Sequence, residues 1–326
     1  MPPSIRFYLQ ETIPAHLESP WEAYQLAASG AVRPGVIAWT VQTCLHLKAS
    51  GFACELTNSI PTEGILVAHR KSVPRDFIPP QGVLFVCLRA DATFHPYAHW
   101  HVVQNRAALS SWFPSVYMPH WPQPGLIRRD PARGDLFSNA AYFGEPTYIA
   151  EEMRNPAWGD LMSELQLQWH FPGPEKWHDF SETDVVVAVR GFDTHRRENK
   201  PPSKLFNAWH AGVPAILGNE SAYQQERRGT LDYLEAGSFA ELAAALRRLH
   251  RDPMLRREMR ANGLDRAKET DPSVVTKMWR EFFELTAMPA CEALQRGGGW
   301  QRMLHRWNGL VKMATQDLRE RASRKR

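Results

Sequence analysis

The chain lacks any long run of uncharged apolar residues. A helix needs about 20 such residues to span a bilayer, and no stretch of the 326 residues approaches that length. The first residues, Met1–Ile13, also lack the basic start, apolar segment and small-residue cleavage site of a signal peptide. Since 43% of the residues are hydrophobic, enough to build a full core, we expect a soluble, globular, cytoplasmic protein.

Cysteine is also scarce. Cys44, Cys54, Cys87 and Cys291 lie far apart among apolar residues, and no two of them form a C-x-x-C pair. Disulfide frameworks and zinc sites both show patterned cysteine spacings. We therefore predict buried free thiols.

Motifs for several cofactors are absent. The sequence has no G-x-G-x-x-G and no P-loop pattern, which argues against dinucleotide oxidoreductases and P-loop NTPases. His95, His99 and His101 form a histidine-rich segment (HPYAHWH), but no nearby carboxylate or cysteine completes a metal shell. We expect neither a metal site nor a cofactor.

Positive charge is concentrated at the carboxyl terminus. From Arg296 to Arg326 there are nine lysines and arginines against Asp317 and Glu320, a net charge of +7. Because the whole chain carries +4, the preceding residues carry −3. Nucleic-acid-binding domains usually show a basic stripe on the folded body, so nucleic acid is not an expected partner.

The same terminal segment predicts an amphipathic helix. Its apolar residues recur at helical spacing opposite several arginines: Trp300, Met303, Leu304, Trp307, Leu310, Val311 and Leu318. A terminal helix that packs back onto the body is one interpretation, and a helix that lies on an anionic membrane is the other. The triplet Gly297–Gly299 hinges this segment separately, so peripheral membrane binding through Trp300–Arg326 stays open.

The remaining pattern predicts two α/β domains. In the first half, alternating or apolar runs predict strands around one helix, Pro34–Lys48: Ser4–Gln10, Phe52–Leu56, Gly64–His69, Gly82–Leu88 and His99–Gln104. Met118–Gly134 is rich in proline and arginine, which is typical of a linker. We place the domains at residues 1–125 and 126–290, followed by a basic helix at 291–326.

The second half predicts further strands and helices. The expected strands are Asn139–Phe143, Leu167–Phe171, Val185–Val189 and Pro214–Leu217. The expected helices are Tyr148–Leu165, Ser203–His210, Phe239–His250, Pro253–Ala267 and Pro272–Leu285. Ser238 and Glu241 form a capping box for the third of these helices.

The stretch Asp184–Leu217 predicts an anion site. Val185–Val189 is apolar throughout, as in a parallel strand that is covered on both faces. After a charged loop, Ser203 can cap the next helix and Gly212 can end it. Such a strand, loop and helix place free backbone N–H groups at the carboxyl edge of a sheet, where open α/β folds bind anions. Arg190, Lys200 and Lys204 should meet at this edge, so the residues predict a diphosphate site.

Lys204–Pro214 (KLFNAWHAGVP) resembles the donor-site helix of GT-B glycosyltransferases, which reads roughly K-L-x-E-A-x-x-x-G-x-P before a strand. Leu231–Ala267 is similar to the same enzymes, with a helix that begins S-x-x-E-L and a D-P-x-L-R-x-x-M segment. The resemblance covers Asp184–Ala267 and reaches the amino-terminal half only by architecture. It implies two Rossmann-like domains facing a central cleft, with the donor on the second and the acceptor on the first. The absence of D-x-D argues against the metal-dependent GT-A class.

The resemblance also implies roles for single residues. Lys204 and the helix amino terminus would hold the donor diphosphate, and the residue one turn on, here Asn207, would bind the ribose. Many retaining members carry paired glutamates, whereas this chain has Asn199, with Glu198 beside it, and Asn207. The stereochemistry of transfer therefore stays open.

Charge develops on the β-phosphate as a nucleotide-diphosphate sugar departs, and fixed cations and helix N–H groups can stabilise it without a metal. The residues Asn219–Ser221 follow a strand and could meet the sugar hydroxyls. The predicted donor-binding residues are Arg190, Lys200, Ser203, Lys204, Asn207, Glu220 and Ser221.

Polar residues also follow the strands of the first domain. An inverting enzyme needs a general base for the acceptor hydroxyl, and His69 and Asp91 are the catalytic candidates. Arg89 and His95 are further acceptor-side candidates. A retaining enzyme needs no such base.

We expect an enzyme that moves a sugar from a nucleotide-diphosphate sugar to a glycan or lipid-linked acceptor without a metal. Bacterial polysaccharide or glycoconjugate synthesis is the expected setting. A nucleotide-sugar epimerase on the same architecture is one alternative. A non-catalytic sugar-nucleotide or glycan-binding subunit is another.

Overall fold

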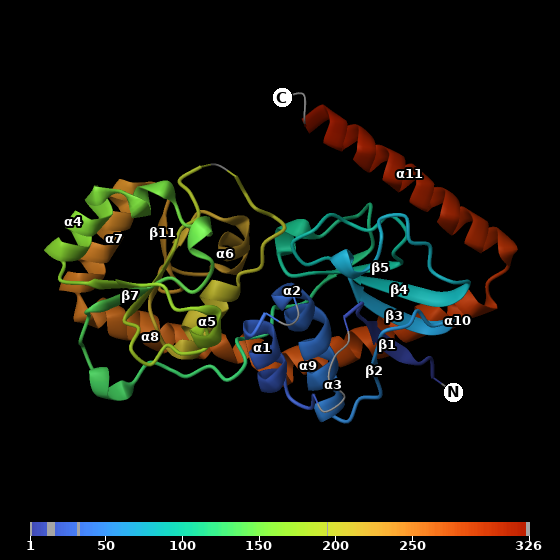
Figure 1. The fold of residues 1–326 in the computed structure, drawn as a ribbon, viewed down its shortest axis with the longest axis horizontal. Coiled ribbons are helices and arrows are strands. Elements are labelled where there is room, and N and C mark those ends of the chain that lie inside the picture. Colours follow the sequence, from blue (N-terminus) through green and yellow to red (C-terminus); the bar gives the residue numbers. More distant parts are fainter. Residues whose placement is uncertain (1, 12–16, 31–32, 194, 324–326) are drawn as a thin grey trace. The chain divides into compact units, whose positions relative to one another are not determined.

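The structure is a computed structural model that describes residues 2–11, 17–30, 33–193 and 195–323. The chain forms two compact α/β units (Figure 1). Unit 1 comprises Met1–Val103, Ala108–Met118 and Thr276–Arg326, and unit 2 comprises Gln104–Ala107 and Pro119–Val275. Each unit contains one parallel sheet, so the prediction of an α/β fold with two Rossmann-like sheets is confirmed.

Unit 1 is built on six parallel strands in the order β2-β1-β3-β4-β5-β6. Their bounds are β1 Ile5–Tyr8, β2 Glu55–Thr57, β3 Glu63–His69, β4 Gly82–Leu88, β5 Trp100–Val103 and β6 Ser115–Tyr117. The two central strands, β3 and β4, are buried along almost their whole length. Their apolar sequences need helices on both faces, which is the usual state of a parallel sheet.

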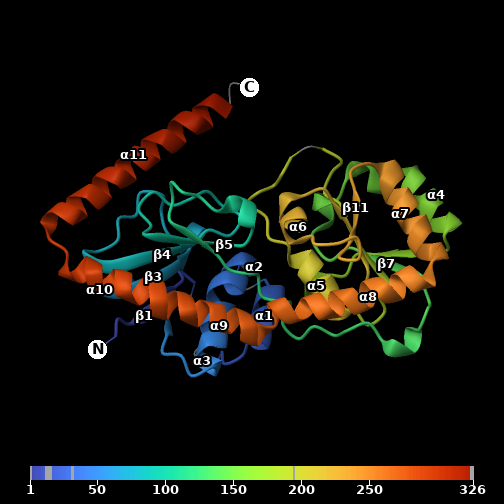
Figure 2. The ribbon, with the colours of Figure 1, turned by 180° about the vertical axis from the view of Figure 1, so that it is seen from behind.

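The helices of unit 1 come from both ends of the chain. From the amino-terminal part come α1 Pro20–Ala28, α2 Pro34–Val36 and α3 Gln42–Ala49, with a π-helical turn at Ile37–Val41 between the last two. From the carboxyl-terminal part come α9 Pro272–Phe282, α10 Met288–Arg296 and α11 Gly299–Ser323. Figure 2 shows α9 and α10 running across one face of the unit 1 sheet, and α10 packs on β3 and β4.

Unit 2 is built on five parallel strands in the order β11-β10-β9-β7-β8. Their bounds are β7 Asn139–Ala141, β8 Gln168–His170, β9 Val185–Ala188, β10 Ala215–Gly218 and β11 Leu234–Ala236. The helices are α4 Pro156–Glu164, α5 Ser203–Ala211, α6 Ser221–Glu226, α7 Phe239–Arg251 and α8 Pro253–Ala267. α5 packs against β9, β10 and α8, which fixes its amino terminus at one edge of the sheet.

Several local predictions differ from the structure. The predicted helix Tyr148–Leu165 is two short 3₁₀ turns followed by α4, because Pro156 disfavours helical backbone in the residue before it. Ser203 does not cap α5: Pro202 occupies the cap position, and Ser203 is already the first helical residue. Gly212 does end α5 in the left-handed conformation, with φ +66°. The sequence patterns gave no indication of α1 or β6.

The basic terminal helix is present as α11, which has 25 residues. Across residues 2–11, 17–30, 33–193 and 195–323, no helix is both long enough and apolar enough to cross a bilayer.

Candidate functional site

Charged side chains gather at the carboxyl edge of the unit 2 sheet. Arg190 follows β9, and Glu220 follows β10. Lys204 lies in the first turn of α5, which returns to the same edge. Because all five strands are parallel, their carboxyl ends and the helix start meet there.

Glu220 and Arg190 form a buried ion pair. The Glu220 side chain is only 2% exposed, and its Oε2 accepts a hydrogen bond from Nη1 of Arg190. Its other oxygen, Oε1, has no hydrogen-bond partner within the described residues. The neighbouring Asn219 Oδ1 is likewise buried without a partner in this part of the chain. Buried polar atoms normally find partners, so these two oxygens are unsatisfied acceptors at this edge of the sheet.

Lys204 is half-buried beside this pair. Its Nζ lies 5.0 Å from the centroid of the Tyr142 ring, and within the described residues it forms no ion pair. Burial is the main cause that lowers the pKa of Lys204, to about 7, and the positive charge of Arg190 lowers it further, while Glu220 partly offsets both. An ammonium group held in this way gains strongly from an added anion.

Gly144 leaves room for this ammonium group. A Cβ atom built on Gly144 would lie 3.2 Å from Lys204 Nζ and 3.1 Å from the Tyr142 ring. A side chain at this position would require Lys204 or the Tyr142 ring to shift by a few tenths of an ångström. Tyr142 and Gly144 were not identified from the sequence, although a glycine just after a short strand is a usable signal of close backbone approach.

The first turn of α5 adds backbone donors. Pro202, at the cap position, provides no side-chain cap to the first N–H groups. Such free N–H groups, together with the helix dipole, favour a bound anion. Lys204 and this helix end therefore point to the same kind of ligand.

The other predicted donor residues are less open. Oδ1 of Asn207 accepts a hydrogen bond from the backbone N–H of Gln123 at 3.0 Å. Ser221 is buried, and its Oγ accepts from Nδ2 of Asn105 at 2.9 Å. Lys200 is half-buried at the end of a turn, and its backbone N–H donates a hydrogen bond to the carbonyl of Arg197. Asn207 and Ser221 thus hold neighbouring segments of unit 2 in place.

The catalytic candidates lie in unit 1. His69 ends β3, and its Nδ1 accepts a hydrogen bond from the backbone N–H of Lys71 at 3.1 Å. The neutral ring therefore carries its proton on Nε2. Burial lowers the pKa of His69 to about 4. Asp91 is partly exposed, and its Oδ1 lies 3.7 Å from Nζ of Lys71.

The two acceptor-side candidates have local structural contacts. Nε of Arg89 donates to the carbonyl of Ala92 at 2.9 Å, and its guanidinium lies 4.4 Å from the Phe94 ring centroid. His95 is fully buried, with Nδ1 accepting from the Tyr97 N–H and Nε2 at 2.9 Å from the Pro74 carbonyl. Burial lowers the pKa of His95 to about 4. The structure therefore places His95 in the core.

The other two residues of the histidine segment are also occupied. His99 Nδ1 accepts from the Phe85 N–H at 2.9 Å, and the His101 ring contacts the backbone of His95. Within the described residues, no group of three or more His, Cys, Asp or Glu side chains is arranged to hold a metal ion.

Comparison with solved structures gives the fold. AviGT4, a glycosyltransferase involved in avilamycin A biosynthesis, matches with a TM-score of 0.52 and 12% identity, over 91% of this chain and 99% of that one. HepE from Anabaena, solved with UDP, matches with a TM-score of 0.49 and 10% identity, over 86% of this chain and 99% of that one. The pneumococcal O-GlcNAc transferase GtfA, solved with UDP and GlcNAc, matches with a TM-score of 0.48 and 12% identity. That match covers 73% of this chain and 58% of GtfA.

No protein-family model matches the sequence, and no curated protein matches it. The fold assignment therefore rests on the likeness to AviGT4. At 12% identity this likeness shows the fold alone. The chain has the fold of the GT-B glycosyltransferases, as the resemblance at Lys204–Pro214 predicted.

Proposed function

We propose that this protein is a glycosyltransferase that moves a sugar from a nucleotide-diphosphate sugar to a hydroxyl of a glycan or lipid-linked acceptor. The observation that carries the proposal is Lys204, a half-buried ammonium group without an ion-pair partner in the described residues, beside the open first turn of α5. A diphosphate supplies the missing negative charge. The fold likeness to a glycosyltransferase supports the same reaction class.

In this proposal unit 2, which contains most of the donor domain expected at residues 126–290, binds the donor. Lys204, Arg190 and the N–H groups of α5 face the diphosphate, and Lys200 and Ser203 lie close by. As the bond from the sugar C1 to the β-phosphate oxygen breaks, negative charge grows on that phosphate. Fixed cations and N–H groups stabilise this charge without a metal. We propose that the unsatisfied oxygens of Asn219 and Glu220 become acceptors for the sugar hydroxyls when the donor binds.

Residues 1–125 bind the acceptor in the same proposal. Asp91 is the better base for an inverting reaction, because a carboxylate is ready to accept a proton at neutral pH. His69 carries its proton on Nε2 and accepts the Lys71 N–H on Nδ1, so it suits hydrogen-bond donation to an acceptor oxygen. We place the enzyme in bacterial polysaccharide or glycoconjugate synthesis.

A thermal-shift screen over nucleotide diphosphates and their sugars tests donor binding, because a ligand that binds only the folded chain raises its melting temperature. We expect at least one compound to raise the melting temperature of the wild type but not of Lys204→Ala. Lys268→Ala is the matched control, since Lys268 is exposed on unit 2 and pairs with Asp265. If no compound stabilises the wild type, or if Lys204→Ala responds equally, the proposed site is wrong.

Turnover of the compound found in that screen separates the reaction classes. A transferase consumes the donor faster when acceptor is added, whereas an epimerase interconverts the sugar without acceptor. Binding with neither transfer nor epimerisation would support a non-catalytic subunit instead.

A further inference from the structure

α11 contacts the rest of unit 1 through polar residues. The His305 ring stacks on His99 at 4.1 Å between centroids, and Nε2 of His305 lies 3.1 Å from the Tyr97 carbonyl. Lys312 Nζ lies 5.0 Å from the Phe113 ring centroid, and Nε2 of Gln316 donates to the Phe94 carbonyl at 3.0 Å. These positions recur at spacings of seven and four, which defines one stripe of a helix.

Gly309 lies in the middle of this stripe. A Cβ atom at this position would overlap the Tyr97 ring, so the helix approaches the rest of unit 1 closely here and only glycine fits. The residue after Gln316, Asp317, pairs with Arg75 at 2.6 Å. The inner stripe of α11 is therefore a specific contact surface, although it contains almost no apolar side chains.

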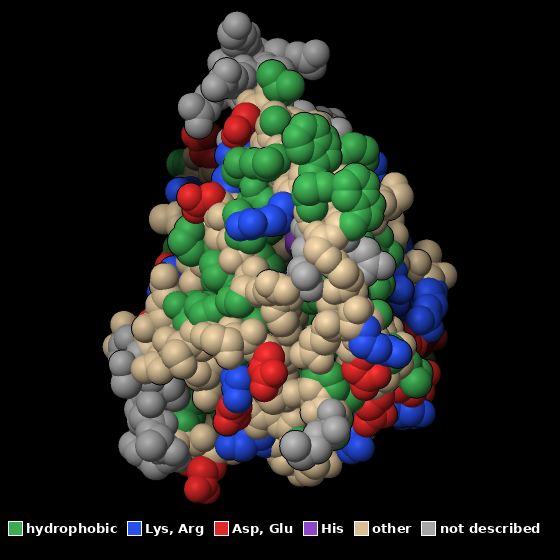
Figure 3. Space-filling model, turned by 90° about the vertical axis from the view of Figure 1, so that its right-hand side faces the viewer, with side chains coloured by type: hydrophobic (Ala, Val, Ile, Leu, Met, Phe, Trp, Pro, Cys, Tyr) green, Lys and Arg blue, Asp and Glu red, His purple; other side chains and the backbone are tan. Residues whose placement is uncertain are grey.

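The apolar stripe of α11 faces away from unit 1. Of the eighteen large hydrophobic side chains that are exposed in the described residues, seven lie on this one helix. They are Trp300 (66% exposed), Met303 (53%), Leu304 (42%), Trp307 (65%), Leu310 (49%), Val311 (40%) and Leu318 (66%). Helices on soluble proteins normally bury such a stripe, so the orientation of α11 is the reverse of the usual one. Figure 3 shows large hydrophobic side chains gathered on the upper part of this end of unit 1.

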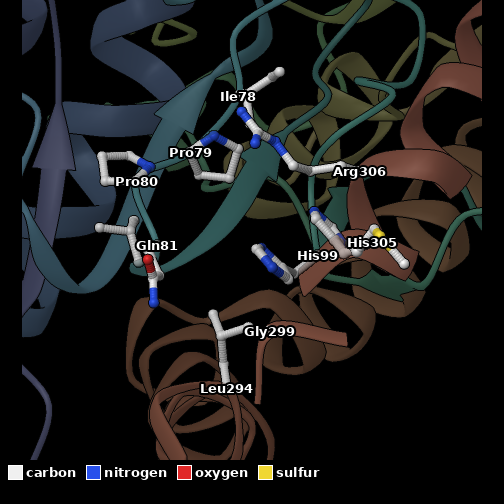
Figure 4. A pocket seen from close by; sticks show the side chains of 11 residues that line it. Ile78, Pro79, Pro80, Gln81, His99, Leu294, Gly299, His305 and Arg306 are labelled. Carbon is white, nitrogen blue, oxygen red and sulfur yellow. The ribbon is translucent and has the colours of Figure 1, made fainter. Parts of the chain in front are cut away.

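A cavity separates the start of α11 from the body. It has a volume of about 560 Å³, and its lining includes Pro79, Leu294, His99, His305 and Arg306 (Figure 4). The apolar residues of α11 are not used to fill this space, apart from Met303 at its border. The helix is thus held by a few specific polar contacts. Burial of its apolar stripe does not contribute to the stability of the fold.

The charge of this segment indicates what covers the stripe. Trp300–Arg326 contains eight lysines and arginines against two carboxylates, whereas residues 1–295 carry a net charge of −3. Arg306, next to the stripe, is exposed and forms no ion pair within the described residues. This combination of an apolar stripe, two tryptophans and excess positive charge on one helix complements an anionic bilayer. The acyl chains accommodate the apolar side chains, and the lipid phosphates attract the cations.

We propose that the outward stripe of α11 lies in the headgroup region of an anionic phospholipid membrane and holds unit 1 there. The tryptophans and leucines enter the boundary of the acyl chains, and the exposed Arg306 contacts lipid phosphates. Nothing in the fold of α11 has to change, because its apolar side already faces outward. This inference goes beyond the proposed transfer reaction and does not depend on it.

Co-sedimentation of the full chain with vesicles tests the proposal. The probes are phosphatidylcholine vesicles with and without 25% phosphatidylglycerol. We expect the wild type to sediment with the anionic vesicles and to be released by 1 M salt. The double variant Trp300→Ser/Trp307→Ser should lose at least tenfold in partitioning. Its melting temperature should not fall, since these two side chains are largely exposed.

Trp112→Ser is the matched control, because Trp112 is an exposed tryptophan of unit 1 outside α11 (56%). It should partition like the wild type. Equal binding by the double variant, or no binding of the wild type to anionic vesicles, would overturn the proposal. A dimer in lipid-free solution that the double variant dissociates would also overturn it, in favour of a second copy of this chain. The double variant should still bind nucleotide diphosphate like the wild type, which shows that the loss of membrane binding is independent of the donor site.

Discussion

The two edges of the unit 2 sheet both carry buried charges, but they use them differently. At the amino edge, Asp184 precedes β9 and is 2% exposed. It accepts hydrogen bonds from Arg129 at 2.8 Å and Arg133 at 2.7 Å, and from the N–H groups of Ser138 and Asn139 at 2.9 and 3.0 Å. Burial opposes ionisation of Asp184, but Arg133, these N–H groups and Arg129 together lower its pKa below the ordinary value.

At the carboxyl edge the charges are only partly satisfied. Glu220 pairs with Arg190 through one oxygen, and its other oxygen has no partner in the described residues. Lys204 has the Tyr142 ring but no carboxylate at ion-pair distance in this part of the chain. A buried polar atom without a partner costs about 1–3 kcal/mol. This destabilisation applies at the carboxyl edge but not at Asp184 on the amino edge, where both carboxylate oxygens have partners.

The difference separates a structural network from the proposed binding site. Each oxygen of Asp184 is already used, so a ligand has nothing to add there. Lys204 has no ion-pair partner and Glu220 Oε1 no hydrogen-bond partner within the described residues, so a bound molecule could supply both. Mutation at the amino edge should therefore reduce stability, and mutation at the carboxyl edge should mainly reduce binding.

The largest effect is expected for Asp184→Asn. This variant leaves Arg129 and Arg133 buried without an anion, and breaking a buried network in this way costs about 3–5 kcal/mol. Chemical denaturation of the full chain measures the loss. Nucleotide diphosphate affinity per folded molecule should not change.

Asp135→Asn is the control for this variant, because Asp135 pairs with Arg257 on the exposed surface of the same unit. Exposed pairs contribute little, so its unfolding curve should match that of the wild type. If both aspartates proved equally dispensable, the amino edge would not be the structural network described here.

Arg190→Met should affect both properties. It removes a cation from the proposed diphosphate site and leaves Glu220 buried without its partner. A hydrogen bond to a charged group contributes about 1.5–3 kcal/mol, which corresponds to a loss in donor affinity of roughly 10- to 150-fold. The double variant Arg190→Met/Glu220→Gln should recover stability but not affinity.

Calorimetry on both variants checks this prediction. Recovery of affinity together with stability would mean that Arg190 acts only as the partner of Glu220.

Donor affinity should also depend on pH through Lys204. Its pKa is about 7 in the folded chain, below the ordinary 10.5, and a bound diphosphate raises it again. Above pH 7, binding then takes up a proton, and affinity falls by up to about tenfold per pH unit. Titration calorimetry at pH 7, 8 and 9 measures this slope, and Lys204→Arg should abolish it, because arginine stays protonated. A wild-type affinity that is constant over this range would contradict a lowered pKa.

The same shift has the opposite effect on stability. Between pH 7 and 10.5 the folded chain binds fewer protons at Lys204 than the unfolded chain does, so the contribution of this residue to stability rises with pH.

Much of the fold could be predicted from sequence because parallel strands buried on both faces are apolar throughout. β3, β4 and β9 were recognised for this reason, and Gly212 marked the end of α5. Short elements gave no such signal: β6 has three residues, and its pairing with β5 depends on distant residues. The predicted helix Tyr148–Leu165 did not take account of Pro156, which begins a separate helix, α4.

The sequence predicted which charged residues the candidate site contains, but it did not predict the contacts between their side chains. Arg190, Lys204 and Glu220 follow two strands and open one helix, and the order of a parallel sheet brings them to one edge. The pairing of Arg190 with Glu220 and the packing of Lys204 on Tyr142 bring together residues that follow three different strands and one that lies on α5. His95 was misleading because a polar residue after a strand can equally turn back into the core, where Pro74 and Tyr97 bind its ring.

The most direct test of the central claim is Lys204→Met, with stability and donor affinity measured on the same sample. We predict that nucleotide diphosphate binding weakens by about 100-fold, as for the loss of a charged hydrogen-bond donor. The free energy of unfolding at pH 7 should stay unchanged or rise, since a half-buried cation without an ion pair is removed. A loss of stability with unchanged affinity would contradict the account, because Lys204 would then belong with Asp184 among the structural charges.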